Sequence, residues 1–527
     1  MNQVANTQPN PVVMHPGERN TVRKIGCRLG RGIATRIDLR SVLSFFLPFG
    51  LFLLTLSPTI YNLDSAELTT AAATGGLMRA TGYPLYLSIG HLWAKLPVGD
   101  VGFRMNLFSA FWGALTILLG DQILRRWKVG PLAAWGALGL LTTGTYFWGM
   151  SLIAEVYTLH TALMAGLILA LLRWGEQPTL RRMLLVGLLT GLSLSHHMAA
   201  VLLIPGSIFY LLAAAPRQAL TPGSLSMGLL GLLAGLSFYL YLPLRYTAGP
   251  VFNYAGLFDS QLNFTGVNLA SIQGVFWLVT GQSFTNQMFA YRGWALWQQF
   301  VNFSIQLAQA FFVFGVVPGL LGLVRLFRRD WRQAGMLLIM FVLSAGFYID
   351  YAVVDKITMF LPAYLLWGLW VGYGFQALFN WMHKNLNDGW MQRTSLNLVR
   401  IGIGGVVLLA LAWNWNITDL SGDFSAREQG EKILAQAKPD ALVFGWWDTV
   451  PVIQYLQLVE GKRPDVTAIN RFLISNEDLL RAVRENAGAR PVYIDNPPAE
   501  LSAFVRPRLQ GPVYELIPNQ SHIGGKE

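Results

Sequence analysis

Long apolar runs alternate with short polar loops along most of the chain. A helix of about 18–25 residues can cross a bilayer of about 30 Å. The clearest apolar runs, of 15 to 20 residues, lie at 41–60, 131–150, 336–351 and 401–415. The pattern predicts about eleven membrane-spanning helices. We place them at 41–60, 103–120, 131–150, 152–172, 183–195, 198–213, 224–243, 301–325, 334–351, 359–379 and 400–417. The segment 183–213 could alternatively form one bent helix instead of two short ones.

The pattern changes after residue 417, where charged residues become frequent. Its periodicity predicts helices at 424–436, 450–458 and 476–486 and strands at 441–445, 465–469 and 491–495. We therefore expect an all-α polytopic membrane protein with a small C-terminal α/β domain. The expected parts are a basic N-terminal tail (1–40), a membrane domain (41–417) and a tail domain (418–527).

The composition excludes a soluble, fibrous or disordered protein. Hydrophobic residues make up 53% of the chain and charged residues 13%, whereas a soluble domain carries about 25% charged residues. The net charge of +11 could indicate nucleic-acid binding, but most Lys and Arg lie in short loops, where they orient membrane helices. Cys27 is the single cysteine, so the chain cannot form an intrachain disulfide.

The loop charges predict the orientation in the membrane. Basic residues gather in the N-terminal tail and in alternate loops, among them Arg125, Arg126, Lys128, Arg325, Arg328 and Arg329. Since basic loops remain in the cytoplasm, we expect a cytoplasmic N-terminus and a first run that acts as a signal anchor. The segments 61–102 and 244–300 and the tail domain then face outward. The low cysteine count favours a bacterial plasma membrane over an endoplasmic reticulum.

Two carboxylates follow the first apolar run directly. Asp64 and Glu67 are three residues apart, so they share one face of a helical turn. Asp64 could cap a helix, with Glu67 completing a capping box. Alternatively, Asp64 could act as a general base at the outer boundary of the membrane.

Other ionisable residues interrupt apolar segments on the predicted outer side. Arg79 and Tyr83 flank a Gly-Tyr-Pro turn, and Arg79 could either hold a phosphate or extend to the interface. The remaining candidates are Glu155 beside His160, the adjacent His196 and His197, Arg245, and Lys356 beside Asp355. Helix ends, mutual hydrogen bonds or an Asp355–Lys356 ion pair could account for them without any ligand. Neighbouring histidines on a helix point about 100° apart, so His196 and His197 are a poor metal site.

Acids and bases at one face would suit sugar transfer from a lipid phosphate. A carboxylate would deprotonate an acceptor hydroxyl, and cations would stabilise the departing phosphate. Because phosphate leaves as an anion, such an enzyme needs no strong general acid, in contrast to a glycosidase. We expect no metal-ligand set and no cofactor, and a role for a divalent metal stays open.

Several short motifs, in a shared order, resemble a family of GT-C glycosyltransferases that was long known only as a domain of unknown function. This family includes the animal endoplasmic-reticulum protein O-mannosyltransferase. The resemblance rests on Asp-Ser-Ala-Glu-Leu at 64–68, Thr-Gly-Tyr-Pro-Leu-Tyr at 81–86, Phe-Arg-Met-Asn-Leu-Phe-Ser-Ala at 103–110, Glu-Val-Tyr-Thr-Leu-His at 155–160, Ser-His-His at 195–197, Tyr-Leu-Pro-Leu-Arg at 241–245, Phe-Leu-Pro-Ala-Tyr at 360–364 and Trp-Asp-Thr-Val-Pro at 447–451.

The resemblance implies a polyprenyl-phosphate sugar as donor and a catalytic carboxylate just after the first span. Asp64 occupies that place, and Glu67 matches the second acid of the family. The family usually has His-Pro where this chain has Arg79 and Ala80, so Arg79 either replaces that histidine or its role is absent.

The sequence thus predicts an integral membrane glycosyltransferase that moves a sugar, with mannose as first candidate, to a hydroxyl of a protein or glycan acceptor. Asp64 is the expected base and Glu67 its support. Arg79, Tyr83, Glu155, His196, His197, Arg245 and Lys356 are the expected contacts to donor phosphate or substrate. A flippase or transporter of lipid-linked sugars is one alternative, although its repeats and deep polar residues are not evident. A non-catalytic assembly protein is another, and there Asp64 would be dispensable.

Overall fold

A computed structural model describes residues 38–354, 356–386 and 389–519. The chain divides into two units, Met1–Val42 and Leu43–Glu527. The predicted basic tail and Cys27 lie outside the described residues, except for 38–40. Asp355, half of the expected Asp355–Lys356 pair, lies outside them as well. Apart from the first four residues of α2 (Leu39–Thr55), all that follows concerns the second unit.

Six helical segments of the described residues are long and apolar enough to cross a membrane. They are α5 (Val101–Arg126), α8 (Tyr157–Glu176), Pro222–Thr247 (α12, Pro222–Leu236; η2, Ser237–Leu240; α13, Tyr241–Thr247), α17 (Trp331–Ile349), Lys356–Asn385 (η4, Lys356–Phe360; α18, Leu361–Asn385) and α19 (Trp390–Thr418). Three apolar helical segments are shorter: α2 (Leu39–Thr55), α6 (Pro131–Thr143) and Met198–Ala214 (η1, Met198–Leu203; α10, Ile204–Ala214). The remaining helices of this part are α7 (Thr145–Met150), α9 (Leu180–His196), α11 (Pro216–Ala219), α15 (Gly293–Ala310) and α16 (Val316–Arg329).

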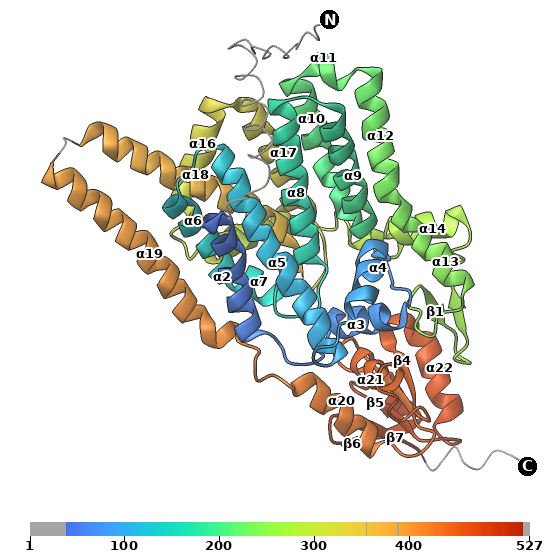
Figure 1. Cartoon of the computed structure of the whole chain (residues 1–527). Coiled ribbons are helices and arrows are strands. Elements are labelled where there is room, and N and C mark those ends of the chain that lie inside the picture. Colours follow the sequence, from blue (N-terminus) through green and yellow to red (C-terminus); the bar gives the residue numbers. More distant parts are fainter. Residues whose placement is uncertain (1–37, 355, 387–388, 520–527) are drawn as a thin grey trace, which may run out of the picture. The chain divides into compact units, whose positions relative to one another are not determined.

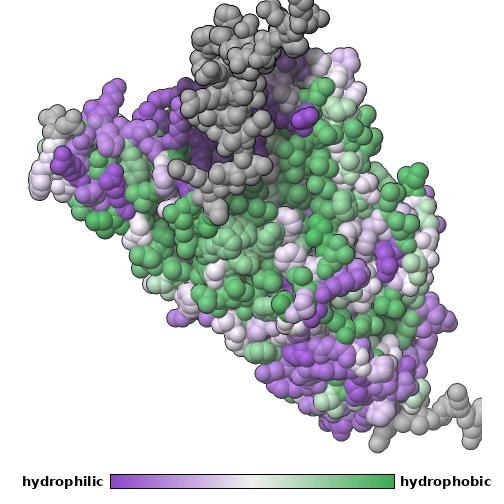
Figure 2. All heavy atoms as spheres, in the orientation of Figure 1, coloured by the Kyte–Doolittle hydropathy of each residue, from purple (hydrophilic) through white to green (hydrophobic). Residues whose placement is uncertain are grey.

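The helices form a bundle with a buried centre and an apolar outer surface (Figures 1 and 2). In the most apolar windows of α8 and α18, 83% of the residues are buried, against 17% in α19 and in the α12 segment. Exposed apolar helix faces are expected where lipid is the solvent. The prediction of a helical membrane protein is confirmed, while the number of about eleven spans stays a prediction.

Two predicted spans are interrupted and one ambiguity is resolved. The segment 131–150 is two helices, α6 and α7, separated at Gly144. The segment 301–325 is two helices, α15 and α16, separated at Phe311–Gly315. A continuous helix would place Pro318 in its interior, whereas a start at Val316 places Pro318 in the first turn, where its missing N–H costs nothing. The segment 183–213 contains two helices, because His197 has extended backbone angles between α9 and η1.

Small residues allow α9 and α12 to approach closely. Gly191 faces Gly235, and a Cβ atom at Gly187 would lie 2.0 Å from the backbone oxygen of Gly228 in α12. Two glycines four residues apart on each helix are typical of close helix pairs in membranes. This contact brings the end of α9, with His196 and His197, toward the predicted outer segments.

The predicted outer segments fold as short elements at one end of the bundle (Figure 1). They are α3 (Asp64–Thr74), α4 (Pro84–Trp93), β1 (Gly256–Phe258), β2 (Phe264–Gly266), α14 (Ile272–Val279) and η3 (Gln282–Gln287). Residues 85–96 form an apolar stretch that is too short to span a bilayer, and most of it is α4. Strands β1 and β2 pair in an antiparallel ribbon.

The tail domain is a five-stranded sheet with helices, which confirms the predicted small α/β domain. Its elements are α20 (Ser425–Gln436), β3 (Leu442–Gly445), α21 (Val450–Leu458), β4 (Thr467–Asn470), η5 (Arg471–Leu473), α22 (Asn476–Asn486), β5 (Val492–Ile494), η6 (Ala499–Ala503), β6 (Val505–Gln510) and β7 (Val513–Pro518). The strand order is β4-β3-β5-β7-β6. Strands β4, β3 and β5 are parallel, and β7 and β6 extend the sheet in antiparallel fashion.

Candidate active site

Two carboxylates and one guanidinium meet at the start of α3. Arg79 Nη2 donates to Asp64 Oδ1 at 2.5 Å, and Arg79 Nε donates to both oxygens of Glu67 at 3.2 and 3.3 Å. The residue that precedes the helix is Leu63, and no side chain caps it. Asp64 and Glu67 therefore do not form the capping box that was one interpretation of the sequence. Both face Arg79 instead.

Aromatic residues of the tail domain cover the guanidinium. The centre of the Arg79 guanidinium lies 4.6 Å from the Trp447 ring and 5.3 Å from the Phe472 ring. The two rings stack on each other with centroids 4.4 Å apart. A cation over aromatic faces in a partly desolvated place is held by the ring quadrupoles. The site is thus built from the first outer segment and the tail domain together.

The two acids differ in their access to solvent. The Asp64 side chain is 27% exposed, whereas the Glu67 side chain is fully buried and that of Arg79 is 14% exposed. Burial raises the pKa of Glu67 to about 7, although Arg79 opposes the rise; nearby Asp64 adds to it. Burial disfavours the charged form of Arg79, but Asp64 and Glu67 outweigh it and raise the pKa of the guanidinium. Arg79 is therefore a permanent cation, and Asp64 is the carboxylate that a substrate can reach.

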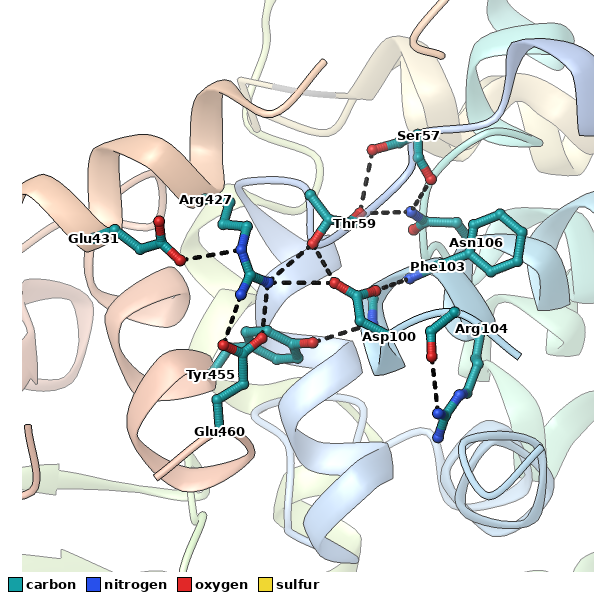
Figure 3. A network of polar contacts seen from close by, with 12 residues as sticks. Ser57, Thr59, Asp100, Phe103, Arg104, Asn106, Arg427, Glu431, Tyr455 and Glu460 are labelled. Carbon is teal, nitrogen blue, oxygen red and sulfur yellow. Dashed lines mark hydrogen bonds and ion pairs between the residues drawn. The ribbon is translucent and has the colours of Figure 1, made fainter. Parts of the chain in front are cut away.

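A second polar network fastens the tail domain to the first outer segment (Figure 3). Arg427 of α20 bonds both oxygens of Glu460 at 2.7 Å and reaches Asp100 Oδ2 and Thr59 Oγ1 at 3.3 Å. Asp100 also caps α5 by accepting from the Phe103 backbone N–H at 2.7 Å. The pKa of Arg427 is raised, mainly because its guanidinium donates hydrogen bonds to Glu460. This network holds the domain that supplies Trp447 and Phe472.

Three histidines and their aromatic neighbours form a cluster near the ends of α8 and α9. The His197 ring centroid lies 5.4 Å from that of His160 and 5.5 Å from that of Tyr83. His196 contacts the Val156 carbonyl through Nε2 at 2.8 Å and stacks 6.3 Å from Tyr86. Burial raises the pKa of Tyr83, which follows Arg79 in the same turn. The structure thus brings His196, His197 and Tyr83 together in one cluster.

Glu155 lies beside this cluster at the start of α8. It is buried, and its Oε2 accepts from the Val156 backbone N–H at 3.2 Å. Ser109 donates to the Glu155 carbonyl and accepts from its N–H, which fixes the backbone. In the part of the chain that the structure describes, no group of three His, Cys, Asp or Glu residues could hold a metal ion.

Arg245 and Lys356 make contacts away from the acid pair. Arg245 Nε donates to the Gly75 carbonyl at 2.5 Å, and Nη2 donates to the Thr74 carbonyl at 3.3 Å, at the far end of α3. Gly75 has a φ of +63°, and a Cβ atom there would lie 2.8 Å from Arg245 Nη2, so this turn requires glycine. Lys356 donates to the Ile349 carbonyl at 3.2 Å and lies 4.6 Å from the Tyr291 ring centroid. A phosphate role for either residue stays a prediction.

Sequence reasoning missed the residues that the tail domain contributes. Trp447 begins one of the motifs that carry the family resemblance, and this signal could have marked it as part of the site. Phe472, Arg427 and Asp100 stand in no motif that we identified. Their roles depend on how the tail domain docks.

Solved structures of other proteins share the fold of this chain. The crystal structure of ArnT from Cupriavidus metallidurans bound to undecaprenyl phosphate superposes with a TM-score of 0.52 and 13% identity, covering 92% of this chain and 99% of that one. The Archaeoglobus fulgidus oligosaccharyltransferase in its apo form gives a TM-score of 0.52 and 13% identity, over 83% of this chain and 65% of that one. The fold is thus that of the GT-C glycosyltransferases.

Sequence comparisons find similarity to one family over part of the chain. Residues 64–220 match the family model of the protein O-mannosyl-transferase TMEM260 N-terminal domain. The mouse protein O-mannosyl-transferase TMEM260 is 32% identical over 213 residues, which are 38% of this chain and 30% of the relative. The Dictyostelium discoideum protein of the same description is 20% identical over 476 residues, 81% of this chain and 56% of the relative.

These matches confirm the resemblance seen in the motifs. The chain spans between about a third and a little over half of the length of these relatives. The matched region begins at Asp64, so it contains both carboxylates, Arg79 and the histidine cluster.

Proposed function

We propose that the chain is a membrane glycosyltransferase that moves a sugar from a polyprenyl phosphate to a hydroxyl of a protein or glycan acceptor. Mannose is the first sugar to test, because the matched relatives are described as O-mannosyl-transferases. Support for a lipid-phosphate donor comes from the ArnT structure, which is described as bound to undecaprenyl phosphate. The proposed reaction takes place at the extracytoplasmic face, and the loop charges support this orientation.

The observation that carries the proposal is that Arg79 contacts two carboxylates, the accessible Asp64 and the buried Glu67. Asp64 is the proposed general base, because its side chain is partly exposed while that of Glu67 is buried. Glu67 is the proposed support, since it holds Arg79 through Nε. Arg79 Nη1 is then the nitrogen that can meet a phosphate oxygen, as guanidinium groups bind phosphates through paired N–H groups.

The proposed chemistry requires Asp64 to leave Arg79. A donor phosphate competes with the carboxylate for the guanidinium, so donor binding would release Asp64 for the acceptor. Asp64 would then take the proton of the acceptor hydroxyl as its oxygen bonds the anomeric carbon. The bond between that carbon and the phosphate oxygen breaks, and the phosphate leaves as an anion stabilised by Arg79.

The neighbouring candidates remain part of the proposal as substrate contacts. Tyr83 and His197 lie next to each other and extend the site from Arg79 toward α9. His196 and Glu155 are buried beside these two residues and would hold Tyr83 and His197 in position. Whether a divalent metal assists the phosphate is left to the assay, in which chelator and metal are varied.

The test is a donor panel. Purified full-length protein in lipid nanodiscs is incubated with several polyprenyl-phosphate sugars and a hydroxyl acceptor, and released polyprenyl phosphate is measured. We expect wild type to consume one donor and Asp64→Asn to lose at least about 100-fold in rate. Asp419→Asn is the matched control, because the Asp419 carboxylate accepts from the backbone N–H of Ser421, two residues away.

The alternatives give different outcomes. Equal consumption by wild type and Asp64→Asn would refute Asp64 as the base. Movement of an intact lipid-linked sugar across liposomes, without release of polyprenyl phosphate, would replace the proposal by transport. Neither consumption nor movement with any donor would favour a non-catalytic assembly protein.

A further inference from the structure

A basic cavity lies between the ends of three helices. It has a volume of about 680 Å³ and lies at the C-terminal ends of α5, α16 and α18. Five basic side chains line it: Lys128, Arg325, Arg328, Arg329 and Lys384. Hydrophilic residues also gather at this end of the bundle in Figure 2. The cavity has no part in the site described above, because α5 has 26 residues and separates it from Asp100 by about 38 Å.

The charges of the cavity are not neutralised by described residues. Its lining contains no Asp or Glu, and none of the five basic side chains forms an ion pair with a described carboxylate. The neighbouring Arg125 and Arg126 do form such pairs, with Asp121 and Glu176. The cavity therefore concentrates five positive charges around a space of ligand size.

Aromatic and amide groups give the cavity a fixed wall. Arg329 donates to the Trp127 carbonyl at 2.7 Å and to the Tyr373 hydroxyl at 3.3 Å. Trp127 and Tyr373 pack edge to face with centroids 5.8 Å apart. Gln376 accepts from the Gly130 N–H at 2.8 Å and donates to Asn380 at 2.9 Å. Arg329 is thus held in place by hydrogen bonds, and Arg325, Arg328 and Arg329 are all exposed.

Two ordinary roles explain basic residues here, but they do not explain the cavity. Cations near helix C-termini complement the helix dipole, and basic loops orient the chain in the membrane. Neither role needs a concave site or an aromatic wall. By contrast, basic pockets between helices on the cytoplasmic side of membrane proteins bind anionic lipid head groups.

We propose that this cavity is a binding site for a phosphate-bearing anion of head-group size. Guanidinium groups bind phosphate oxygens in pairs, and Lys128 and Lys384 add point charges. The phosphate could belong to an anionic lipid of the adjacent leaflet or to a soluble phosphate compound. The site stands independently of the proposed transferase reaction.

The test measures lipid binding to the full-length protein in detergent by native mass spectrometry. Dioleoyl phosphatidylglycerol and dioleoyl phosphatidylcholine are titrated separately, and pyrophosphate is added as a soluble competitor. Wild type should bind phosphatidylglycerol more tightly than phosphatidylcholine. Arg325→Gln/Arg328→Gln should weaken that binding roughly 30-fold, as expected for the loss of two cations near a lipid phosphate.

Two variants make the result specific. Arg181→Gln/Arg217→Gln removes the same charge from two exposed arginines elsewhere and should leave the affinity within threefold. Arg325→Lys/Arg328→Lys keeps the charge and should retain most of the binding. Displacement of lipid by micromolar pyrophosphate would support the site and assign it to a soluble phosphate. Equal affinity for both lipids together with no binding of pyrophosphate, or equal losses in the two glutamine variants, would overturn the proposal.

Discussion

Replacing Arg427 with alanine should loosen the tail domain from the segment that carries Asp64. Arg427 lies on α20, and its partners Glu431 and Glu460 belong to the same domain. Its contacts to Asp100 and Thr59 cross to the first outer segment (Figure 3). Because Trp447 and Phe472 reach Arg79 only when the domain is docked, this perturbation acts on the candidate site from a distance.

The structure sets the size of the effect. Arg427 is 23% exposed and its bond to Asp100 is 3.3 Å long, so the bond belongs at the lower end of the range of about 1.5–3 kcal/mol for charged hydrogen bonds. Ile60 and Ala66 also pack in one apolar cluster with residues of the tail domain, and this contact survives the substitution. We therefore expect docking to weaken by about 1.5–2 kcal/mol, or roughly 10–30-fold in the ratio of docked to undocked protein.

Hydrogen exchange of the full-length protein in nanodiscs measures this ratio. Amides of α3 and α21, which pack at the interface, should exchange roughly 10–30-fold faster in Arg427→Ala. Arg481→Ala is the control, because it removes an exposed pair with Glu477 inside α22 and should change neither helix. Unchanged exchange of α3 and α21 in Arg427→Ala, or the same acceleration in Arg481→Ala, would refute the reasoning.

Three further substitutions test individual contacts. Burial raises the pKa of Glu67 from 4.5 to about 7. The protonated Glu67 side chain therefore stabilises the folded protein fully below pH 4.5, and this stabilisation is lost as the pH rises through 7. The decrease in Tm between pH 5 and 7.5 should be smaller in Glu67→Gln than in wild type. Trp447→Ala removes a ring that contacts the Arg79 guanidinium and should raise the donor KM roughly fivefold, whereas Trp447→Phe should stay close to wild type; an unchanged KM in the alanine variant would contradict a role of this ring. Arg245→Ala removes hydrogen bonds to the last carbonyls of α3 and should lower Tm without changing donor KM; a tenfold rise in KM at unchanged Tm would assign Arg245 to the donor phosphate instead.

The fold was predictable where the pattern of apolar residues is local. The tail helices at 450–458 and 476–486 have the bounds that periodicity predicts. Strands β6 and β7 were missed, because β6 reads Val-Arg-Pro-Arg-Leu-Gln and is largely polar. It lies at the edge of the sheet, where polar residues and proline are tolerated. The turn at Gly511, with a φ of +59°, was the available signal for this hairpin.

Only the residues of the candidate site that lie close together in the sequence were predictable. The spacing of Asp64 and Glu67 places both acids on one helical face, and Arg79 follows in the next turn. That Arg79 binds both acids depends on the path of the chain between α3 and α4. That Trp447 and Phe472 cover it depends on tertiary packing between distant segments, which no local pattern encodes. The capping contacts of Arg245 are hidden from the sequence for the same reason.

The account is tested most directly by the transfer rate of Asp64→Asn at saturating donor and acceptor. This substitution keeps the size of the side chain and its contact to Arg79, and it removes the base. We predict that kcat falls at least about 100-fold, while the donor KM does not rise, because the phosphate no longer competes with a carboxylate for Arg79. A kcat within threefold of wild type would contradict the assignment of Asp64 as the base and with it the proposed mechanism.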